Sequence, residues 1–176
     1  MAALAAQSLA GRPVSALVAS PLQRTRESAA PWTAAFGLPA TVDERIVEPW
    51  NVFEGTRMRQ AIRRPSNWRH LLRPGLPSWG EPYVEIRDRM LAAMAEAWDE
   101  AEAGEVVLVS HQTPIEMVSR SARGLRLAND PRRRRTRLSS ITTFRRDPAA
   151  PGGWAEVDYQ EPAAGLLDEA IDTGAV

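Results

Sequence analysis

Cysteine and lysine are both absent from the 176 residues of this sequence. Without cysteine the chain has no disulfide, no thiol nucleophile and no cysteine ligand for zinc. Without lysine it can form neither a Schiff base with a carbonyl substrate nor the lysine contact of a P-loop nucleotide site. All 22 basic residues are arginine, so these classes of chemistry are excluded.

Net charge and long hydrophobic runs are absent as well. The 22 basic residues balance 22 acidic residues, so no overall field attracts nucleic acid or an anionic membrane. No apolar run is long enough to span a membrane, and the Ala-rich residues 1–9 lack the basic flank of a signal peptide. We therefore expect a cytoplasmic protein without nucleic-acid or membrane partners, for which a homo-oligomer stays open.

Hydrophobic residues make up 44% of the chain and charged residues 25%, which is typical of one globular domain with its own core. That domain is expected to span residues 1–162, with a flexible acidic tail at 163–176. Residues 49–81 differ from the rest of the chain in composition, because they contain several prolines, glycines and tryptophans. They predict an inserted cap region, the usual place for substrate selection in an α/β enzyme.

Strand-like and helix-like segments alternate along the chain. This alternation predicts a layered α/β domain with a mostly parallel sheet. Right-handed crossovers would then bring the loops after Ser20 and Ser110 to the same edge of the sheet. Strands are expected at 14–20, 41–46, 105–110, 140–146 and 154–159, and helices at about 1–10, 21–36, 57–72, 82–103 and 114–123.

One strand-to-helix junction contains His111. The apolar run 106–109 leads into this histidine, and a helix is expected directly after it. Thr113, Pro114 and Glu116 fit a capping box with proline at the first helical position. His111 would therefore lie where the carboxyl end of a strand meets the positive end of a helix, which is a site that favours anions.

A second junction repeats this construction around Arg24. A buried strand ends at Ser20, which would cap a helix that begins at Pro21, and Gln23 would close the capping box. Arg24 then falls on the first helical turn, where its planar guanidinium can bind a phosphate beside the backbone N–H groups. Each junction alone fits an ordinary capped helix equally well, whereas the two together predict a phosphate pocket.

Three segments resemble, in order and spacing, the motifs of the histidine phosphatase superfamily, which includes the cofactor-dependent phosphoglycerate mutases. Ala19-Ser-Pro-Leu-Gln-Arg-Thr-Arg-Glu-Ser28 is similar to the S-P-L-x-R segment. Leu38 to Glu48, followed by Phe53-Glu-Gly55, is similar to the segment with the catalytic acid. Val106-Val-Leu-Val-Ser-His111 is similar to the second catalytic-histidine motif. The resemblance implies a three-layer, phosphoglycerate mutase-like α/β sandwich.

The resemblance also implies hydrolysis of a small phosphorylated substrate through a phosphohistidine, without a metal or other cofactor. Arg24 and His111 would hold the phosphate oxygens. The backbone N–H of Gln112 would face the phosphate, although the family usually has glycine there and the longer side chain would narrow the pocket. Glu48 would protonate the leaving oxygen. A mutase acting on phosphoglycerate is the near alternative, and the motifs do not separate the two reactions.

The general acid has one rival in the sequence. The spacing between Glu48 and the later Glu-Gly pair is one residue shorter than in the family, which leaves Glu54 as the alternative acid. The neighbouring Glu44 is expected to be solvated. The acid must be protonated at working pH, which partial burial near a dianionic phosphate promotes.

The phosphate-accepting histidine of the family is missing from this sequence. In the family it follows the first strand in an Arg-His-Gly motif, whereas residues 1–9 favour a helix. Either Met1 is an internal start, so that the upstream frame encodes the strand, Arg-His-Gly and a helix, or the chain is a natural short form. The short form would be a catalytically silent phosphate-ligand or partner-binding module, with a gap beside the strand that ends at His111.

Two further features favour structural interpretations. His70, the only other histidine, lies in a Trp-rich helical segment without strand-end geometry, which favours a structural or surface role. Arginines 132–135 and 137 offer a contact for phosphate or RNA. Zero net charge and the lack of interleaved aromatics favour a solvated helix-to-strand connector instead. Two histidines without an i, i+4 pair also give no recognisable metal site.

Overall fold

A computed structural model describes residues 1–49, 80–128 and 134–167. The expected helix at 57–72, nearly all of the predicted cap, and most of the predicted tail lie outside these residues. No helix in the described ranges is long and apolar enough to cross a membrane.

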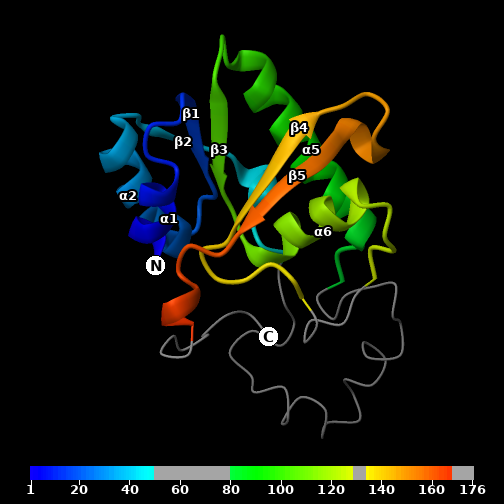
Figure 1. Ribbon diagram of the computed structural model, residues 1–176. Coiled ribbons are helices and arrows are strands. Elements are labelled where there is room, and N and C mark those ends of the chain that lie inside the picture. Colours follow the sequence, from blue (N-terminus) through cyan, green and yellow to red (C-terminus); the bar gives the residue numbers. More distant parts are fainter. Residues whose placement is uncertain (50–79, 129–133, 168–176) are drawn as a thin grey trace, which may run out of the picture.

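The described chain alternates between strands and helices, as the hydrophobic pattern predicts (Figure 1). The longest helices lie within two residues of their expected starts and four of their expected ends, since glycines and polar residues delimit the apolar segments. The elements are α1 (Ala2–Ser8), β1 (Val14–Ala19), α2 (Gln23–Phe36), β2 (Ala40–Val42), η1 (Glu44–Ile46), α5 (Tyr83–Glu100), β3 (Glu105–Val109), α6 (Gln112–Ala122), β4 (Ile141–Arg146), η4 (Pro151–Gly153), β5 (Trp154–Gln160) and η5 (Ala164–Leu166).

Three strands form a parallel sheet in the order β2-β1-β3. The register pairs Leu17 with Val107 and Ala19 with Val109, so β1 and β3 end at the same level. The connection continues past the last pair, because the Ser20 N–H donates to the carbonyl of Val109 at 3.0 Å. The loops after β1 and β3 therefore begin side by side, as expected from right-handed crossovers.

Helices cover both faces of this sheet, which makes a three-layer α/β arrangement. Alternate strand residues enter different cores, because successive side chains of a strand point to opposite faces. One core contains Leu17 with residues of α1 and α2, and the other contains Val18 with residues of α5 and α6. Figure 1 shows α1 and α2 on one side of β1 and β3, with α5 and α6 on the other. The expected three-layer fold is confirmed.

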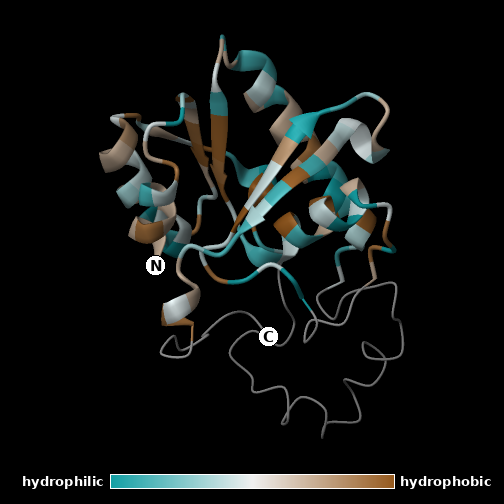
Figure 2. Ribbon diagram, viewed as in Figure 1, coloured by the Kyte–Doolittle hydropathy of each residue, from teal (hydrophilic) through white to brown (hydrophobic). Residues whose placement is uncertain are grey.

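The last two strands form a separate antiparallel pair, β4-β5. Figure 2 shows the contrast with the parallel sheet, since β1 and β3 are mostly hydrophobic in colour whereas β4 and β5 are paler and more hydrophilic. The sequence accounts for this difference, because β3 contains the continuous apolar run at 106–109, which is typical of a strand in a parallel sheet, whereas β4 ends in Arg145 and Arg146.

A slot separates the two sheets. Among the described residues, β3 pairs only with β1 and β4 pairs only with β5, so each has one unpaired edge. A cavity of about 650 Å³ is lined by both strands and continues to the strand ends where His111 lies. We call the part of this cavity between Val106–Val109 and Ile141–Phe144 the β3/β4 slot. It occupies the place of the gap expected beside β3.

Three local predictions are wrong. The strand expected at 41–46 ends at Val42, and a 3-10 turn follows, because the Asp43 side chain caps the N–H of Arg45 at 2.7 Å. Neither expected capping box forms. Helix α2 begins at Gln23 without a side-chain cap, and α6 begins at Gln112 with His111 as its N-cap residue. The predicted capping side chains of Ser20, Thr113 and Glu116 bind elsewhere, to His111, Glu48 and Thr136.

Candidate active site

His111 lies in the loop between β3 and α6, where parallel strand ends and a helix start converge. Its side chain is buried, with 8% exposure. Its Nε2 is 2.8 Å from the Oγ of Ser20, which is the first residue after β1. Ser20 is itself fully buried, so the two strand-end loops are joined side chain to side chain as well as through the backbone.

Arg24 meets His111 from the first turn of α2. Its Nε donates to Nδ1 of the imidazole at 3.4 Å. Because Nδ1 accepts this bond, the proton of the neutral ring lies on Nε2 and is donated to Ser20. The structure thus brings together the arginine and the histidine that the sequence predicts for a phosphate pocket, although they are 87 residues apart.

The imidazole of His111 is neutral in this state. Burial, together with the smaller effects of the positive charges of Arg24 and then Arg89, lowers its pKa from 6.5 to about 4. Desolvation is the main cause of this shift in pKa. An anion held between Arg24 and His111 would oppose both effects and favour the charged ring.

Glu48 reaches the same region from the turn after η1. Its Oε1 accepts from the Thr113 hydroxyl at 2.5 Å, and its Oε2 accepts from the Thr113 backbone N–H at 3.3 Å. Glu48, from a distant segment, therefore caps helix α6 in place of the expected local capping box. Burial raises the pKa of the Glu48 carboxyl, although Thr113, Arg134 and Arg24 act in the opposite direction. A raised pKa is what a general acid needs.

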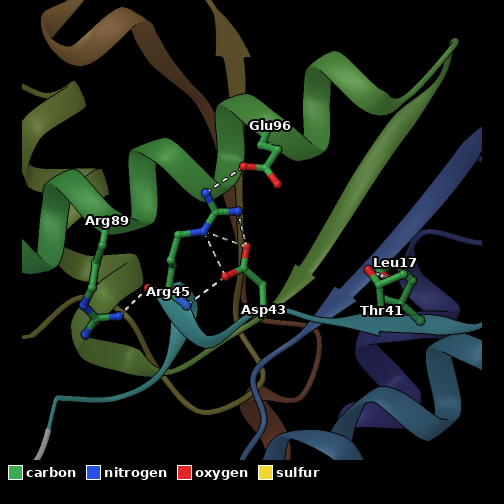
Figure 3. A network of polar contacts seen from close by, with 6 residues as sticks. All are labelled: Leu17, Thr41, Asp43, Arg45, Arg89 and Glu96. Atoms are coloured by element: carbon green, nitrogen blue, oxygen red, sulfur yellow. Dashed lines mark hydrogen bonds and ion pairs between the residues drawn. The ribbon is translucent and has the colours of Figure 1, made fainter.

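The turn before Glu48 is anchored by charged side chains. Figure 3 shows the Arg45 guanidinium between the carboxylates of Asp43 and Glu96, at 2.7 and 2.8 Å. Arg89 of α5 donates to the carbonyl of Arg45. On the other side, the Ser110 hydroxyl donates to the Ile46 carbonyl at 2.7 Å, which ties η1 to the end of β3. These contacts fix the position from which Glu48 enters the site.

Gln112 is the first residue of α6, and its side chain lines the cavity as expected. The amide does not extend into open space. Its Oε1 accepts from Nη1 of Arg134 at 2.9 Å, and its Nε2 donates to the Thr136 carbonyl at 3.3 Å. The role of its backbone N–H toward phosphate stays a prediction.

Sequence reasoning missed three contributors to this site. Ser20 and Thr113 were assigned to helix caps, yet they bind His111 and Glu48. Arg134 was assigned to a solvated connector, yet it lines the cavity. Arg135, in the same connector between α6 and β4, is paired with Glu156. The signal in the sequence was the arginine run at 132–135, which we interpreted as a solvated connector because the net charge is zero.

Other candidates from the sequence are separated from this site or untested. Glu44 is exposed, as expected. The rival acid Glu54 and His70 lie outside the described residues.

Comparison with known proteins gives the family. Residues 1–158 match the histidine phosphatase superfamily (branch 1), so the chain belongs to that superfamily. A similar sequence is the uncharacterized protein Rv0525 of Mycobacterium tuberculosis, which is 42% identical over 166 residues. That alignment covers 93% of this chain and 81% of the relative.

Solved structures share the fold. Mycobacterial hydrolase 1 has a TM-score of 0.67 and 24% identity, over 89% of this chain and 80% of that chain. A mycobacterial glucosyl-3-phosphoglycerate phosphatase, solved with inorganic phosphate, has a TM-score of 0.60 and 27% identity. That match covers 73% of this chain and 68% of the neighbour. The first likeness supports the fold alone, and the second also bears on the proposal below.

Proposed function

We propose that this protein hydrolyses small phosphate monoesters through a phosphohistidine. Membership of the histidine phosphatase superfamily supports phosphatase chemistry, and one similar structure is by its title a glucosyl-3-phosphoglycerate phosphatase. The main observation is that Arg24, His111 and Glu48 line one cavity. Two side chains able to hold phosphate oxygens and a half-buried carboxyl able to act as an acid are the groups that this phosphoryl transfer needs beside a nucleophile.

Arg24 and His111 are proposed to hold the non-reacting phosphate oxygens. Both ring nitrogens of His111 already have partners, Arg24 at Nδ1 and Ser20 at Nε2. This arrangement favours a binding role for His111 over nucleophilic attack, since a nucleophile needs a free lone pair directed at phosphorus. Positioning and charge stabilisation then supply most of the catalysis.

Glu48 is proposed to act on the leaving oxygen. When a histidine nitrogen forms its bond to phosphorus, the bond to the ester oxygen breaks, and Glu48 donates its proton to that oxygen. Water then attacks the phosphohistidine and returns a proton to Glu48. Inorganic phosphate leaves, and the nucleophilic histidine is restored. The raised pKa of Glu48 suits the first of these proton transfers.

The attacking histidine is proposed to enter on a strand in the β3/β4 slot. The N–H of Glu105 donates to Pro13 and the carbonyl of Val109 accepts from Ser20, so alternate backbone groups of β3 point toward β1. By this alternation the backbone groups of Val106 and Leu108 point away from β1, toward the slot. A strand bound there would end beside His111.

The test compares the 176-residue chain with a form extended by the codons in frame upstream of Met1. We expect the extended form to hydrolyse generic phosphomonoesters at a rate unaffected by chelator, and the 176-residue chain to bind phosphate without turnover. Activity that chelator abolishes would contradict the scheme. So would full activity in the 176-residue chain, in which case His70 becomes the nucleophile to examine.

A second candidate function is a silent phosphate-binding module. The specific observation in its favour is that, within the described residues, the sole histidine is His111, whose ring nitrogens are both engaged. The native protein, purified from its source, separates the candidates. Intact mass matching 176 residues, with phosphate binding and no turnover, supports the module; a longer chain with turnover supports the hydrolase.

A further inference from the structure

Arg89 binds the chain on both sides of residues 50–79, which lie outside the described residues. From the first half of α5, its Nε and Nη2 donate to the two carboxylate oxygens of Glu81, at 2.7 and 3.2 Å. Its Nη1 donates to the backbone carbonyl of Arg45, three residues before Glu48 (Figure 3). One planar guanidinium therefore holds the turn that leads to Glu48 against the segment that leads into α5.

A second side chain holds the neighbouring carbonyl of the same turn. The Ser110 hydroxyl donates to the Ile46 carbonyl at 2.7 Å, and the Ile46 side chain is fully buried. Only Val47 separates this residue from Glu48. The two consecutive carbonyls, of Arg45 and Ile46, therefore set where the Glu48 carboxyl lies, because a shift at either one carries over to a residue so close in the chain.

Burial makes Arg89 the stronger of the two arginines that anchor this turn. The Arg89 and Glu81 side chains are 18% and 28% exposed, whereas those of Arg45 and Glu96 are 37% and 56% exposed. Water and salt screen an exposed ion pair, and ordering its long side chains costs entropy. We therefore expect the pair of Arg45 with Glu96 to contribute little to the position of the turn.

We propose that Arg89, oriented by Glu81, is a positioning residue that holds the Glu48 carboxyl against Thr113. Glu48 lines the cavity and Arg89 is not among the described residues that do, so Arg89 acts through Glu48 rather than on a substrate. The contacts of Glu48 with Thr113 are hydrogen bonds of 2.5 and 3.3 Å, which weaken steeply when their geometry changes. The inference rests on the proposed phosphatase function for its consequence in catalysis, since a displaced acid no longer reaches the leaving oxygen.

Nuclear magnetic resonance of the 176-residue chain tests the position of Glu48 without any turnover. The Thr113 N–H donates to Glu48, so its chemical shift should change as the carboxyl ionises, with a pKa above the ordinary 4.5. Glu48→Gln should abolish this titration step, which assigns it. In Arg89→Gln the step should shrink by at least about half, because a displaced carboxylate polarises the N–H less. The Ser20 N–H, which joins the ends of β1 and β3, should keep its shift and so report an intact fold.

Three further variants separate position from charge. Arg87→Gln removes a charge from the same helix at a residue paired with Asp88, and it should leave the Thr113 step unchanged. Arg89→Lys keeps the charge without the planar fork, so it should restore the step only in part. Glu81→Gln should shrink the step less than Arg89→Gln does, because one contact of the guanidinium remains.

The titration step of Thr113 also decides against the proposal. An unchanged step in Arg89→Gln, an equal loss in Arg87→Gln, or full restoration by Arg89→Lys would overturn it. If Arg89→Gln shifts the Ser20 amide and so disturbs the fold, Glu81→Gln decides, and an unchanged step there is the contradicting result.

Kinetics of the extended form then test the consequence for catalysis. Arg89→Gln should lower kcat about tenfold with an alkyl phosphate, with KM nearly unchanged, and less than about twofold with a leaving group acidic enough to depart unprotonated. Equal losses with both leaving groups, together with a reduced Thr113 step, would remove the acid role of Glu48 from the proposed function and leave Arg89 its role in positioning.

Discussion

The site formed by Arg24, Glu48 and His111, which we call the strand-end site, and the β3/β4 slot are two parts of one cavity. They differ in whether their polar groups have hydrogen-bond partners. At the strand ends, Ser20 binds His111 and Thr113 binds Glu48. Along the slot, the backbone groups of Val106 and Leu108 point away from β1, with which β3 pairs in the described part of the chain.

This difference bears on how the proposed phosphatase function is divided between the two regions. The strand-end site is built by crossovers within the described residues, so its binding geometry exists without a further strand. Within the described residues, β3 and β4 each have one unpaired edge, and the proposal is that a further strand binds between them. Phosphate binding and turnover should therefore be separable.

The largest effect is expected from Glu48→Gln in the form of the protein that includes the histidine strand. Gln keeps an acceptor for Thr113 but cannot donate the acid proton, so kcat should fall about 10²- to 10³-fold with an alkyl phosphate. With a leaving group acidic enough to depart unprotonated, the loss should be much smaller. Glu44→Gln, on the exposed neighbouring turn, is the control and should retain activity. Equal losses with both leaving groups would remove Glu48 from the acid role.

The second effect concerns the stability of the strand-end site at low pH. The pKa of His111 is 6.5 in the unfolded chain and about 4 in the folded one, so between these values only the unfolded chain binds the proton. The contribution of the neutral ring to the free energy of unfolding is thus fully present above pH 6.5 and is lost as the pH falls to 4. The loss should reach roughly 3 kcal/mol in the free energy of unfolding.

Denaturant unfolding of the natural chain and of His111→Gln, at pH 7.5 and pH 4, measures this contribution. Carboxylates titrate in both proteins, so the difference between the two isolates the histidine. The natural chain should lose more stability than the variant on acidification. A loss of equal size in both would show that His111 is charged or accessible in the folded state.

A smaller effect is expected from Arg24→Ala on phosphate binding. Removing a charge-assisted contact should weaken the affinity for inorganic phosphate by about 1.5–3 kcal/mol. Arg26, exposed two residues later on the same helix and outside the cavity, is the matched control. Calorimetry that finds Arg24→Ala and Arg26→Ala equal in affinity to the natural chain would discard the pocket.

The smallest effect is local and concerns the edge of β3. In the 176-residue chain, the amides of Val106 and Leu108 should exchange with solvent faster than those of Val107 and Val109, which face β1. In the extended chain all four should be protected. Nuclear magnetic resonance resolves these amides one by one. Protection of Val106 and Leu108 in the shorter chain would mean that the slot is already closed.

Much of this fold followed from the sequence for a physical reason. The apolar runs of β1 and β3 are parallel strands, and right-handed crossovers bring their ends together, so the meeting of Arg24 with His111 was predictable. Helix starts were less predictable. Glu48 competes with the local capping box for the Thr113 N–H, and that contact spans 65 residues. Arg134 was missed because its position in the cavity depends on contacts between α6 and a later segment. Gln112 binds Arg134, and Glu116 binds Thr136.

The most direct test of the account is to trap the phosphorylated intermediate. Both forms of the protein are mixed with a phosphomonoester, quenched at alkaline pH and examined by intact mass and peptide mapping. We predict a gain of one phosphoryl group in the extended chain, on the histidine encoded ahead of Met1, and no gain in the 176-residue chain. A phosphoryl group on His111 or His70, or one on the 176-residue chain at any residue, would contradict the claim that the nucleophile enters through the β3/β4 slot.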